Sequence, residues 1–275
     1  MLRGIVYALQ YWLEPIWLGG SLRIARAMAN SKTAPPNDPT RVLIHIANYN
    51  GKTWVGEAIA SVLNQTHENW GLLVIDDFST DDSTDLIQKF AFQDDRIRLV
   101  LNEQNLGTAR THNLAIERFR DETKWDAFCI LDCDDVASPD WLSTGVYAIR
   151  SGALGLRPIL SRYDEKLERH QWDYIGCNQT FWAREVIEDL GWYRLKPHMY
   201  DHDFMERAKK YAFLRGKCIL QSKRSLQKMR MRGDNQSLKK KGAAEIEAER
   251  LSINWARNTE VKEALFVGQN GQAPV

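Results

Sequence analysis

Three acidic residues directly follow a short apolar run near the middle of the chain, in the sequence Phe128-Cys129-Ile130-Leu131-Asp132-Cys133-Asp134-Asp135. Carboxylates this close together repel one another unless a cation or water offsets their charge. Mg²⁺ and Mn²⁺ prefer carboxylate oxygens and commonly also bind substrate phosphates. The pattern therefore favours a divalent-cation site, whereas an isolated Asp-x-Asp would more simply be a solvated acidic loop.

Strands and helices alternate around this run. Apolar patterning predicts buried strands over 42–47, 72–75, 97–101 and 128–131, with helices over 54–63, around 86–90 and over 109–119 between them. This alternation is typical of an α/β fold with a parallel sheet and right-handed crossovers. Because ligands bind beyond the carboxyl ends of such strands, the polar residues that follow three of them are expected along one rim.

The second half of the chain is less regular. Strands are expected over 156–161 and 172–176, and a helix over 181–193 that closes at Gly191. The basic segment 223–241 is expected to be a flexible loop, and 243–266 an amphipathic helix before a disordered tail. The chain thus divides into four expected segments: 1–40, 41–141, 142–242 and 243–275.

Composition excludes several classes of function. The 37 basic and 36 acidic side chains nearly cancel, so no overall field favours a nucleic-acid partner. The four cysteines form no CxxC pair and no disulfide-like spacing, which favours a reduced, cytoplasmic setting. The GKT at 51–53 lacks the first glycine of a phosphate-binding loop, and no dinucleotide fingerprint, zinc-type spacing or GxSxG elbow is present.

The first 40 residues have a different pattern. Residues 1–29 are apolar but broken at 14–15 and 19–20, and no apolar run approaches the ~20 residues that a membrane span needs. Two tryptophans and three arginines in this segment are typical of a helix lying at a membrane surface, here the inner face. Packing on the rest of the chain or on a second subunit as a homodimer is the alternative. Residues 30–40 form a Pro-rich linker.

The segment from residue 41 to about 141 resembles the nucleotide-binding half of a family 2 glycosyltransferase with the GT-A fold. The matching stretches are IANYNG, AIASVLNQTHENWGLLVIDDFSTDDST, RIRLVLNEQNLGTARTHN and FCILDCDDVASPDWL. The resemblance implies a Rossmann-like, mostly parallel sheet flanked by helices, to which this chain adds an N-terminal helical extension and a C-terminal helix. It also implies inverting transfer from a nucleotide-sugar, most often a UDP-sugar, with Mn²⁺ or Mg²⁺ as cofactor.

The resemblance assigns roles to residues along the rim. Tyr49 lies against the base and Asp77 hydrogen-bonds it, which suits an aromatic face and a carboxylate acceptor. Asp132 and Asp134 form the DxD motif, with Asp134 the expected direct metal ligand. The other residues expected at the nucleotide-sugar are Ala47, Asn50, Asp76, Asn105, Gly107, Arg110, His112, Cys133, Arg230 and Arg232.

The sequence departs from the family pattern at His112, where an arginine is common. His112 either covers the pocket rim or is a structural histidine, which is the commoner outcome, and Arg110 is an alternative cation nearby.

Residues 198–207 resemble the family's Glu-Asp motif, in which the aspartate is the general base, except that Tyr200 replaces the glutamate. Asp201 is therefore the expected base, with Asp203 second. Trp192 and Tyr200 are expected at the acceptor. The structural alternative for Asp201 is an N-cap of the following helix.

Residues 229–237 resemble the family's C-terminal motif, and a basic loop there would close over the diphosphate and exclude water. Arg232 stands near the position where many relatives carry a histidine. A guanidinium offers only donors and cannot bind a metal, but it can hydrogen-bond phosphate oxygens in pairs. Arg230 is a second candidate for that contact.

Two other functions compete with glycosyl transfer. A nucleotidyltransferase shares the sheet but needs a Gly-rich, Arg-containing loop after its first strand, and none is present. A catalytically decayed carbohydrate-binding protein would have lost some of Asp77, Asp132, Asp134 and Asp201, and all four remain. The expected enzyme moves a hexosyl or N-acetylhexosaminyl group to a glycan, lipid-linked or protein hydroxyl, as in cell-surface polysaccharide or glycan biosynthesis.

Overall fold

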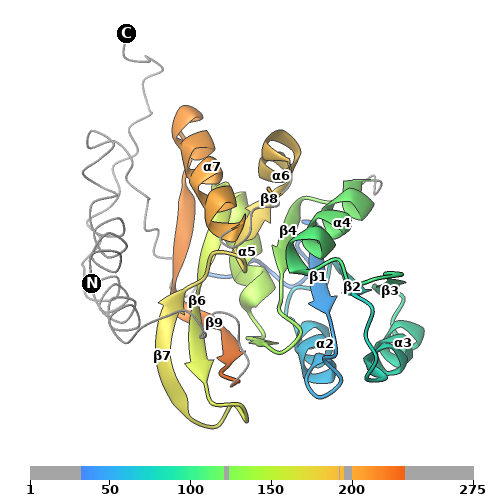
Figure 1. The fold of residues 1–275 in the computed structure, drawn as a ribbon. Helices are drawn as coiled ribbons and strands as arrows, with labels where there is room; N and C mark the ends of the chain where they lie inside the picture. The colour runs from blue at the N-terminus through green and yellow to red at the C-terminus, as the bar shows by residue number, and fades with distance from the viewer. Residues whose placement is uncertain (1–31, 121–123, 192, 195–199, 233–275) are drawn as a thin grey trace, which may run out of the picture.

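One nine-stranded sheet separates two layers of helices (Figure 1). The computed structural model describes residues 32–120, 124–191, 193–194 and 200–232. The strands are β1 (Val42–Asn48), β2 (Trp70–Asp76), β3 (Ile97–Leu101), β4 (Ala127–Ile130), β5 (Val136–Ala137), β6 (Gly155–Tyr163), β7 (His170–Ile175), β8 (Phe181–Ala183) and β9 (Ile219–Arg230). The helices are α2 (Val55–Leu63), α3 (Ser83–Gln93), α4 (Thr108–Arg120), α5 (Trp141–Arg150), α6 (Arg184–Leu190) and α7 (Tyr200–Leu214). In this part of the chain no helix has the length and apolar character to cross a membrane.

The first half of the sheet is parallel and centred on β1. Its strands lie in the order β3-β2-β1-β4, and each neighbouring pair is parallel. Every residue of β2 is buried, and all but one of β1, because helices cover both faces. The register pairs Asn48 with Asp76, so the polar ends of β1 and β2 meet at one edge. The expected α/β fold is confirmed.

The second half of the sheet mixes strand directions. β8 lies antiparallel between β4 and β6, and β9 runs parallel to β6. β7 pairs antiparallel with β6 at the side of the sheet. The two-residue strand β5, which directly follows the acidic cluster, pairs antiparallel with Lys228 and Gln227 of β9. The acidic cluster is therefore held next to β9, near the end of the described chain, by the pairing of β5 with β9.

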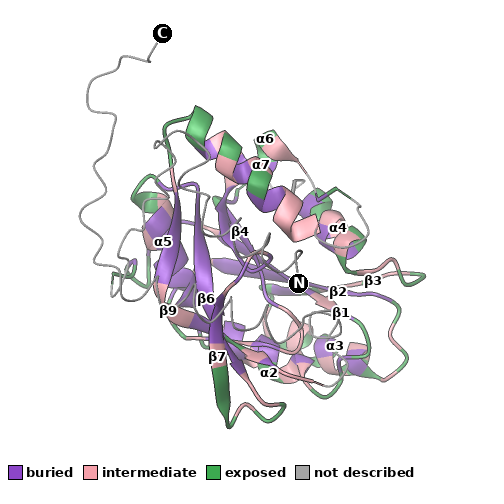
Figure 2. Cartoon of the chain, turned by 60° about the vertical axis from the view of Figure 1, so that its left-hand side comes forward, coloured by how far each residue is buried: buried purple, intermediate pink, exposed green. Residues whose placement is uncertain are grey.

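The two faces of the sheet carry separate hydrophobic cores (Figure 2). Side chains alternate along β1, so Ile44 and Ile46 belong to the core under α2, α3 and α5. Leu43 belongs to the opposite core, under α4, α6 and α7, together with Phe128 and Phe204. Each fully buried side chain of this size stabilises the fold by roughly 1.5–3 kcal/mol. The helices that flank the rim are thereby fixed to the sheet.

Two expectations for the second half were wrong. Phe181–Ala183 is the strand β8 rather than the start of a helix, because these three residues are buried between β4 and β6. The helix that follows, α6, is shorter and ends before Gly191, whose φ of 73° favours glycine. The basic run from Lys223 to Arg230 is part of β9 rather than a loop, since β6 and β5 hydrogen-bond it on both sides. The expected helices within 1–29 and 243–266 lie outside the described residues.

Candidate active site

A buried hydrogen-bond network joins the carboxyl ends of β1 and β2. The Asn48 amide donates to a carboxylate oxygen of Asp76 at 2.7 Å. It also donates to the hydroxyls of Ser83 and Ser79, at 2.8 and 3.2 Å. Asp76 accepts two further hydrogen bonds from Ser79, from the backbone N–H at 2.8 Å and the hydroxyl at 2.6 Å. Both oxygens of Asp76 therefore hold the turn after β2 in shape.

Asp77 stabilises the loop before α4 by accepting hydrogen bonds from it. It is 4% exposed, and one of its oxygens accepts hydrogen bonds from the Asn102 side chain at 2.7 Å and the Leu106 N–H at 2.8 Å. The other oxygen accepts from the N–H of Gly107 at 2.8 Å. The φ of Gly107 is 79°, a conformation that a side chain disfavours. Asp77 thus shapes the loop before α4, and its expected contact with the base stays a prediction.

Two aromatic rings stand exposed where β1 and β2 end. Tyr49 and Phe78 each have 53% of their surface exposed. Asn50 links the two turns, because its N–H donates to the Ser79 hydroxyl at 2.9 Å and its side chain accepts from the Thr80 N–H at 2.8 Å. Phe78 has a φ of 71°, a region that non-glycine residues rarely occupy. Sequence reasoning missed Phe78, although an aromatic residue in a turn of Asp, Ser and Thr was a signal.

The acidic cluster at the end of β4 holds more carboxylates than cations. Asp132 accepts a hydrogen bond from the Gln179 amide at 2.7 Å. Asp134 forms an ion pair with Arg232, with Nε of the arginine 3.1 Å from a carboxylate oxygen. Asp135 is buried and accepts a hydrogen bond from the backbone N–H of Arg230 at 3.2 Å. Gln179 was also missed by sequence reasoning, because it reaches the cluster from a loop 47 residues away.

The charges of the cluster act on one another. Burial and the neighbouring Asp134 raise the pKa of Asp132 to about 7, and Asp201 contributes in the same direction. Burial, together with Asp134 and Asp132, raises the pKa of Asp135 well above its usual range. The same surroundings raise the pKa of the Cys133 thiol. A set of carboxylate oxygens that resist ionisation together, beside a thiol that stays protonated, fits a hard cation such as Mg²⁺ or Mn²⁺.

The two arginines at the end of β9 have different surroundings. Arg230 is 5% exposed, pairs with Glu57 of α2, and donates to the backbone oxygen of Glu165 at 2.9 Å. Arg232 is half-buried beside Asp134. The guanidinium groups lie 5.8 and 5.5 Å from the ring of Trp54, respectively. Arg230 therefore ties β9 to α2, and Arg232 is the arginine directly beside the DxD motif.

His112 is inside the protein. It is 1% exposed, its ring lies 5.2 Å from that of His45, and its Nε2 is 3.3 Å from the side-chain nitrogen of Asn178. Burial lowers the pKa of His112 well below its usual range and that of His45 to about 4, so both are neutral at pH 7. This is the setting of a structural histidine. Asn105 and Arg110 are exposed, and Ala47 is half-buried in β1.

The first turn of α7 carries the two candidate bases. Asp203 accepts a hydrogen bond from Nε of Arg207 at 3.0 Å, and Arg207 also donates to the backbone oxygen of Leu190 at 2.9 Å. Asp203 thereby helps to fix α7 to the end of α6. Asp201 contributes to the raised pKa of Asp132, so the two carboxylates lie close enough for their charges to repel one another.

Of the two acceptor candidates, the structure describes Tyr200, at the start of α7. The Tyr200 ring is 5.3 Å from that of Tyr193 and 6.0 Å from that of His112. Burial raises the pKa of the Tyr200 hydroxyl, with Asp132 and Asp201 adding to the effect. Trp192 lies outside the described residues.

A second set of candidate metal ligands lies beside Asp201. Sγ of Cys177, a carboxylate oxygen of Asp201 and a ring nitrogen of His202 are all within 4.8 Å of one another. However, Nη2 of Arg157 donates to Cys177 Sγ at 3.3 Å, and burial raises the pKa of that thiol. A thiol binds a metal as its thiolate, so a protonated Cys177 leaves this set two ligands, whereas the cluster at the end of β4 offers carboxylate oxygens, which suit a hard cation. The cluster at Asp132 and Asp134 is therefore the better cation site.

Comparison with known families and sequences agrees with this geometry. The family model described as Glycosyl transferase family 2 matches residues 43–229. An uncharacterized glycosyltransferase of Haemophilus influenzae is 33% identical over 101 residues, which are 37% of this chain and 30% of that protein. A putative teichuronic acid biosynthesis glycosyltransferase, TuaG of Bacillus subtilis, is 37% identical over 95 residues, 34% of this chain and 36% of that protein. The matched stretches thus span only about a third of these relatives.

Solved structures share the fold at low sequence identity. S. aureus TarS 1–349 in complex with UDP-GlcNAc has a TM-score of 0.57 at 15% identity, covering 82% of this chain and 69% of that one. The mannosyltransferase PcManGT from Pyrobaculum calidifontis, in complex with GDP-Man and Mn²⁺, has a TM-score of 0.60 at 13% identity, covering 93% and 83%. At these identities the likeness establishes the GT-A fold alone.

Proposed function

Because the chain belongs to glycosyltransferase family 2, we propose that it transfers a sugar from a nucleotide-sugar to a hydroxyl acceptor, with inversion and with a divalent cation. One observation carries the proposal: Asp132, Asp134 and Asp135 lie together at the carboxyl end of β4, with Arg232 beside Asp134 and with Asp201 near enough to raise the pKa of Asp132. Such an excess of carboxylates costs stability unless a cation offsets it. A divalent metal ion supplies that positive charge and can bind the diphosphate of a nucleotide-sugar at the same time.

Donor binding is assigned to the rim of β1 and β2. Tyr49 is exposed where β1 ends, and its ring would stack on the base, while Asp77 would accept a hydrogen bond from the base. The other donor contacts proposed are Ala47, Asn50, Asp76, Asn105, Gly107, Arg110 and Cys133, whereas the buried His112 is given a structural role. Nucleotide-sugars are bound in the complexes of TarS and PcManGT, with UDP and GDP as the respective nucleotides. We propose a UDP-sugar for this chain on the resemblance of its motifs.

Asp134 and Asp132 would hold Mn²⁺ or Mg²⁺, which when bound offsets charge on the departing diphosphate. Arg232 would contact the diphosphate directly, because its planar guanidinium matches two phosphate oxygens. Arg230 is the weaker candidate for that contact, since it already pairs with Glu57.

Asp201 is proposed as the general base. Its carboxylate would take the proton of the acceptor hydroxyl as that oxygen attacks the anomeric carbon, opposite the leaving diphosphate. The bond to the diphosphate breaks on the other face, and the configuration inverts. Asp203, which pairs with Arg207, would instead keep the first turn of α7 in position. Tyr200 and Trp192 are proposed at the acceptor.

The acceptor is proposed to be a glycan, a lipid-linked saccharide or a protein hydroxyl. The similarity to TuaG, a putative teichuronic acid biosynthesis glycosyltransferase, supports a cell-surface polysaccharide pathway. Contact of residues 1–29 with the inner face of a membrane would suit a lipid-linked acceptor, and a homodimer through this segment is the alternative.

A panel of nucleotide-sugars tests the proposal. Each would be assayed for donor hydrolysis and for Mn²⁺-dependent thermal stabilisation of the protein. We expect one UDP-sugar to stabilise the protein only with Mn²⁺ and to release UDP. Release of pyrophosphate from a nucleoside triphosphate, with no response to any nucleotide-sugar, would instead indicate a nucleotidyltransferase.

A further inference from the structure

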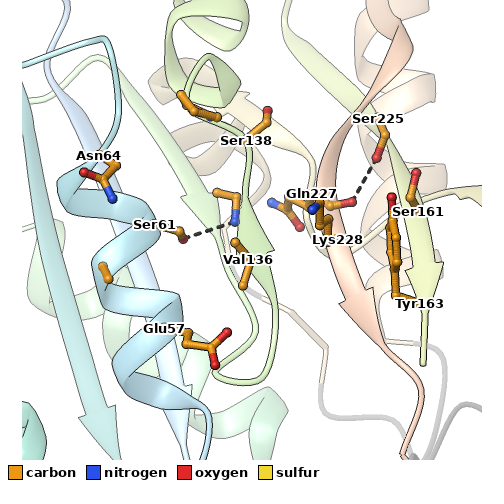
Figure 3. A pocket seen from close by; sticks show the side chains of 13 residues that line it. Glu57, Ser61, Asn64, Val136, Ser138, Ser161, Tyr163, Ser225, Gln227 and Lys228 are labelled. Atoms are coloured by element: carbon orange, nitrogen blue, oxygen red, sulfur yellow. Dashed lines mark hydrogen bonds between the residues drawn. The ribbon is translucent and has the colours of Figure 1, made fainter. Parts of the chain in front are cut away.

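A hollow of about 510 Å³ lies between α2 and the strands β5, β6 and β9 (Figure 3). This volume is within the range of ~300–1,000 Å³ typical of small-molecule sites. None of Asp132, Asp134 and Asp201 lines the hollow. Glu57, which pairs with Arg230, stands at its edge. The hollow is therefore separate from the proposed transfer site.

Gln227 is the strongest sign that the hollow binds a ligand. Its side chain is 1% exposed and lines the hollow from β9. Neither its amide nitrogen nor its amide oxygen has a hydrogen-bond partner among the described residues. A buried amide without partners costs free energy, so both atoms favour a ligand that donates one hydrogen bond and accepts another.

Three serine hydroxyls of the lining already donate within the protein. Ser138 donates to the Asp140 carboxylate at 2.8 Å, and Ser161 to the Asp173 carboxylate at 2.5 Å. Ser225 donates to the backbone oxygen of Gln227 at 3.0 Å. Once a hydroxyl proton is used in this way, the oxygen is left to accept. These three oxygens therefore match the O–H groups of a ligand and do not match an anion such as phosphate.

The remaining lining fits a neutral ligand with apolar faces. Lys228 and Glu57 contribute one charge of each sign, so the hollow has no strong preference for an anion or a cation. Tyr163 contributes an aromatic ring, with the Lys228 ammonium 5.2 Å from its centre. Ala60, Val136 and Pro139 add apolar surface. Sugar rings likewise combine apolar C–H faces with hydroxyl groups at their edges.

We propose that this hollow binds a neutral saccharide of one or two residues, at a site separate from glycosyl transfer. Gln227 donates to and accepts from its hydroxyls, the serine oxygens accept further hydroxyls, and Tyr163 packs on a ring face. The proposal goes beyond the transfer reaction and does not require it. If the chain does transfer sugars, the hollow would hold a distal part of a saccharide acceptor or product.

The test uses the full chain and three disaccharides, cellobiose, maltose and chitobiose, with saturation-transfer NMR as the measurement. We expect at least one to bind, and Gln227→Leu, which keeps the volume but removes both amide atoms, to weaken binding at least about tenfold. Gln171→Leu is the matched control, since Gln171 is exposed on β7, and it should bind like the wild type. Ala60→Trp fills the hollow from α2 and should abolish binding even if Gln227→Leu does not fold.

Two results would overturn the proposal. One is that none of the three disaccharides binds the wild type, and the other is that Ala60→Trp or a folded Gln227→Leu binds them as well as the wild type. The outcome is independent of glycosyl transfer, because Asp134→Ala should keep disaccharide binding while Gln227→Leu should keep nucleotide-sugar hydrolysis.

Discussion

The carboxyl ends of β1 and β2 differ from that of β4 in how their polar groups are satisfied. At β1 and β2, Asp76 accepts from Asn48 and Ser79, and Asp77 accepts from the loop before α4. At β4, Asp132 and Asp135 are held by few hydrogen bonds and have raised pKa values. Both regions are rich in aspartate, and both lie at one rim of the same parallel sheet.

This difference distinguishes aspartates that stabilise turns from aspartates whose charge the protein leaves poorly balanced. Where every carboxylate oxygen has a protein donor, the aspartate stabilises a turn. Where carboxylates mainly have one another as neighbours, ionisation is opposed until a ligand with positive charge binds. The β1–β2 side is therefore the fixed wall of the proposed site, and the β4 side is the part that the proposed metal and donor would complete. The following predictions test this comparison.

The largest effect is expected for Asp134→Ala. Because Asp134 is the proposed direct metal ligand, the change should abolish detectable transfer and remove Mn²⁺-dependent UDP binding measured by calorimetry. Asp95→Ala, at an exposed position near the start of β3, should leave both unchanged. If UDP binds equally well with EDTA and in the Asp134 variant, the β4 side does not hold a metal.

Asp201→Asn should have the next largest effect. The amide keeps the size of the carboxylate but cannot take a proton, so turnover should fall by roughly 10²–10⁴ while UDP affinity stays unchanged. Asp203→Asn is the matched comparison, because Asp203 pairs with Arg207 and Arg194 and is not the proposed base. Near-normal turnover in the Asp201 variant, with a large loss in the Asp203 variant, would assign the role of general base to Asp203 instead.

Arg232 is predicted to contribute less than the aspartates. If it contacts the leaving diphosphate, Arg232→His should lower turnover at fixed Mn²⁺ by roughly 10- to 100-fold, or about 1.4–2.7 kcal/mol of transition-state stabilisation. Arg232→Lys should recover only part of this loss, because a lysine cannot make paired hydrogen bonds. Rates within twofold of the wild type in both variants would show that Arg232 only neutralises the charge of Asp134.

The sequence was enough to predict the fold of the first half and the meeting of the polar strand ends at one rim. Strands such as β1 and β2 are almost continuously apolar, and the carboxyl ends of parallel strands meet at one edge, so the rim followed from local patterns. The short strand β8 was not predictable in this way, because three buried residues have no period.

The roles of individual site residues were harder to predict because they depend on distant contacts. Arg230 and Arg232 are equivalent in the sequence, and only the position of Glu57, 173 residues before Arg230, distinguishes them. Gln179 was hard to predict for a similar reason, because it lies on the loop between β7 and β8 and reaches Asp132 only in the folded chain. Asp76 and Asp77 are adjacent, but the turn after β2 decides which groups each of them can reach.

A pH dependence should accompany the charge excess on the β4 side. The pKa of Asp132 is about 7 in the folded protein, above its usual 3.8, so the folded state binds this proton more tightly than the unfolded state. The free energy of unfolding without metal should therefore fall as the pH rises from about 4 to 7, whereas Mn²⁺ affinity should rise over the same range. Asp132→Asn removes the titrating group and should flatten both profiles, measured by thermal unfolding with EDTA and by calorimetry. Unchanged profiles in this variant would assign the titration to another group.

The smallest effect on turnover is expected on the β1–β2 side, from Asn48→Asp. This change keeps the shape of the side chain but removes the N–H donors to Asp76 and Ser83 and places a second carboxylate beside Asp76. Two buried carboxylates would then lie side by side, as they do at the end of β4. The free energy of unfolding, measured with denaturant, should therefore fall by about 2–4 kcal/mol. Asn69→Asp is the control, because that amide makes one hydrogen bond to the Pro39 backbone oxygen near the surface, and it should cost much less. Since Asn48 is buried and holds a turn rather than a substrate, turnover per folded molecule should stay within about twofold of the wild type well below the melting temperature. A large loss of turnover with unchanged stability would mean that the β1–β2 side takes part in the reaction, and the contrast between the two regions would not hold.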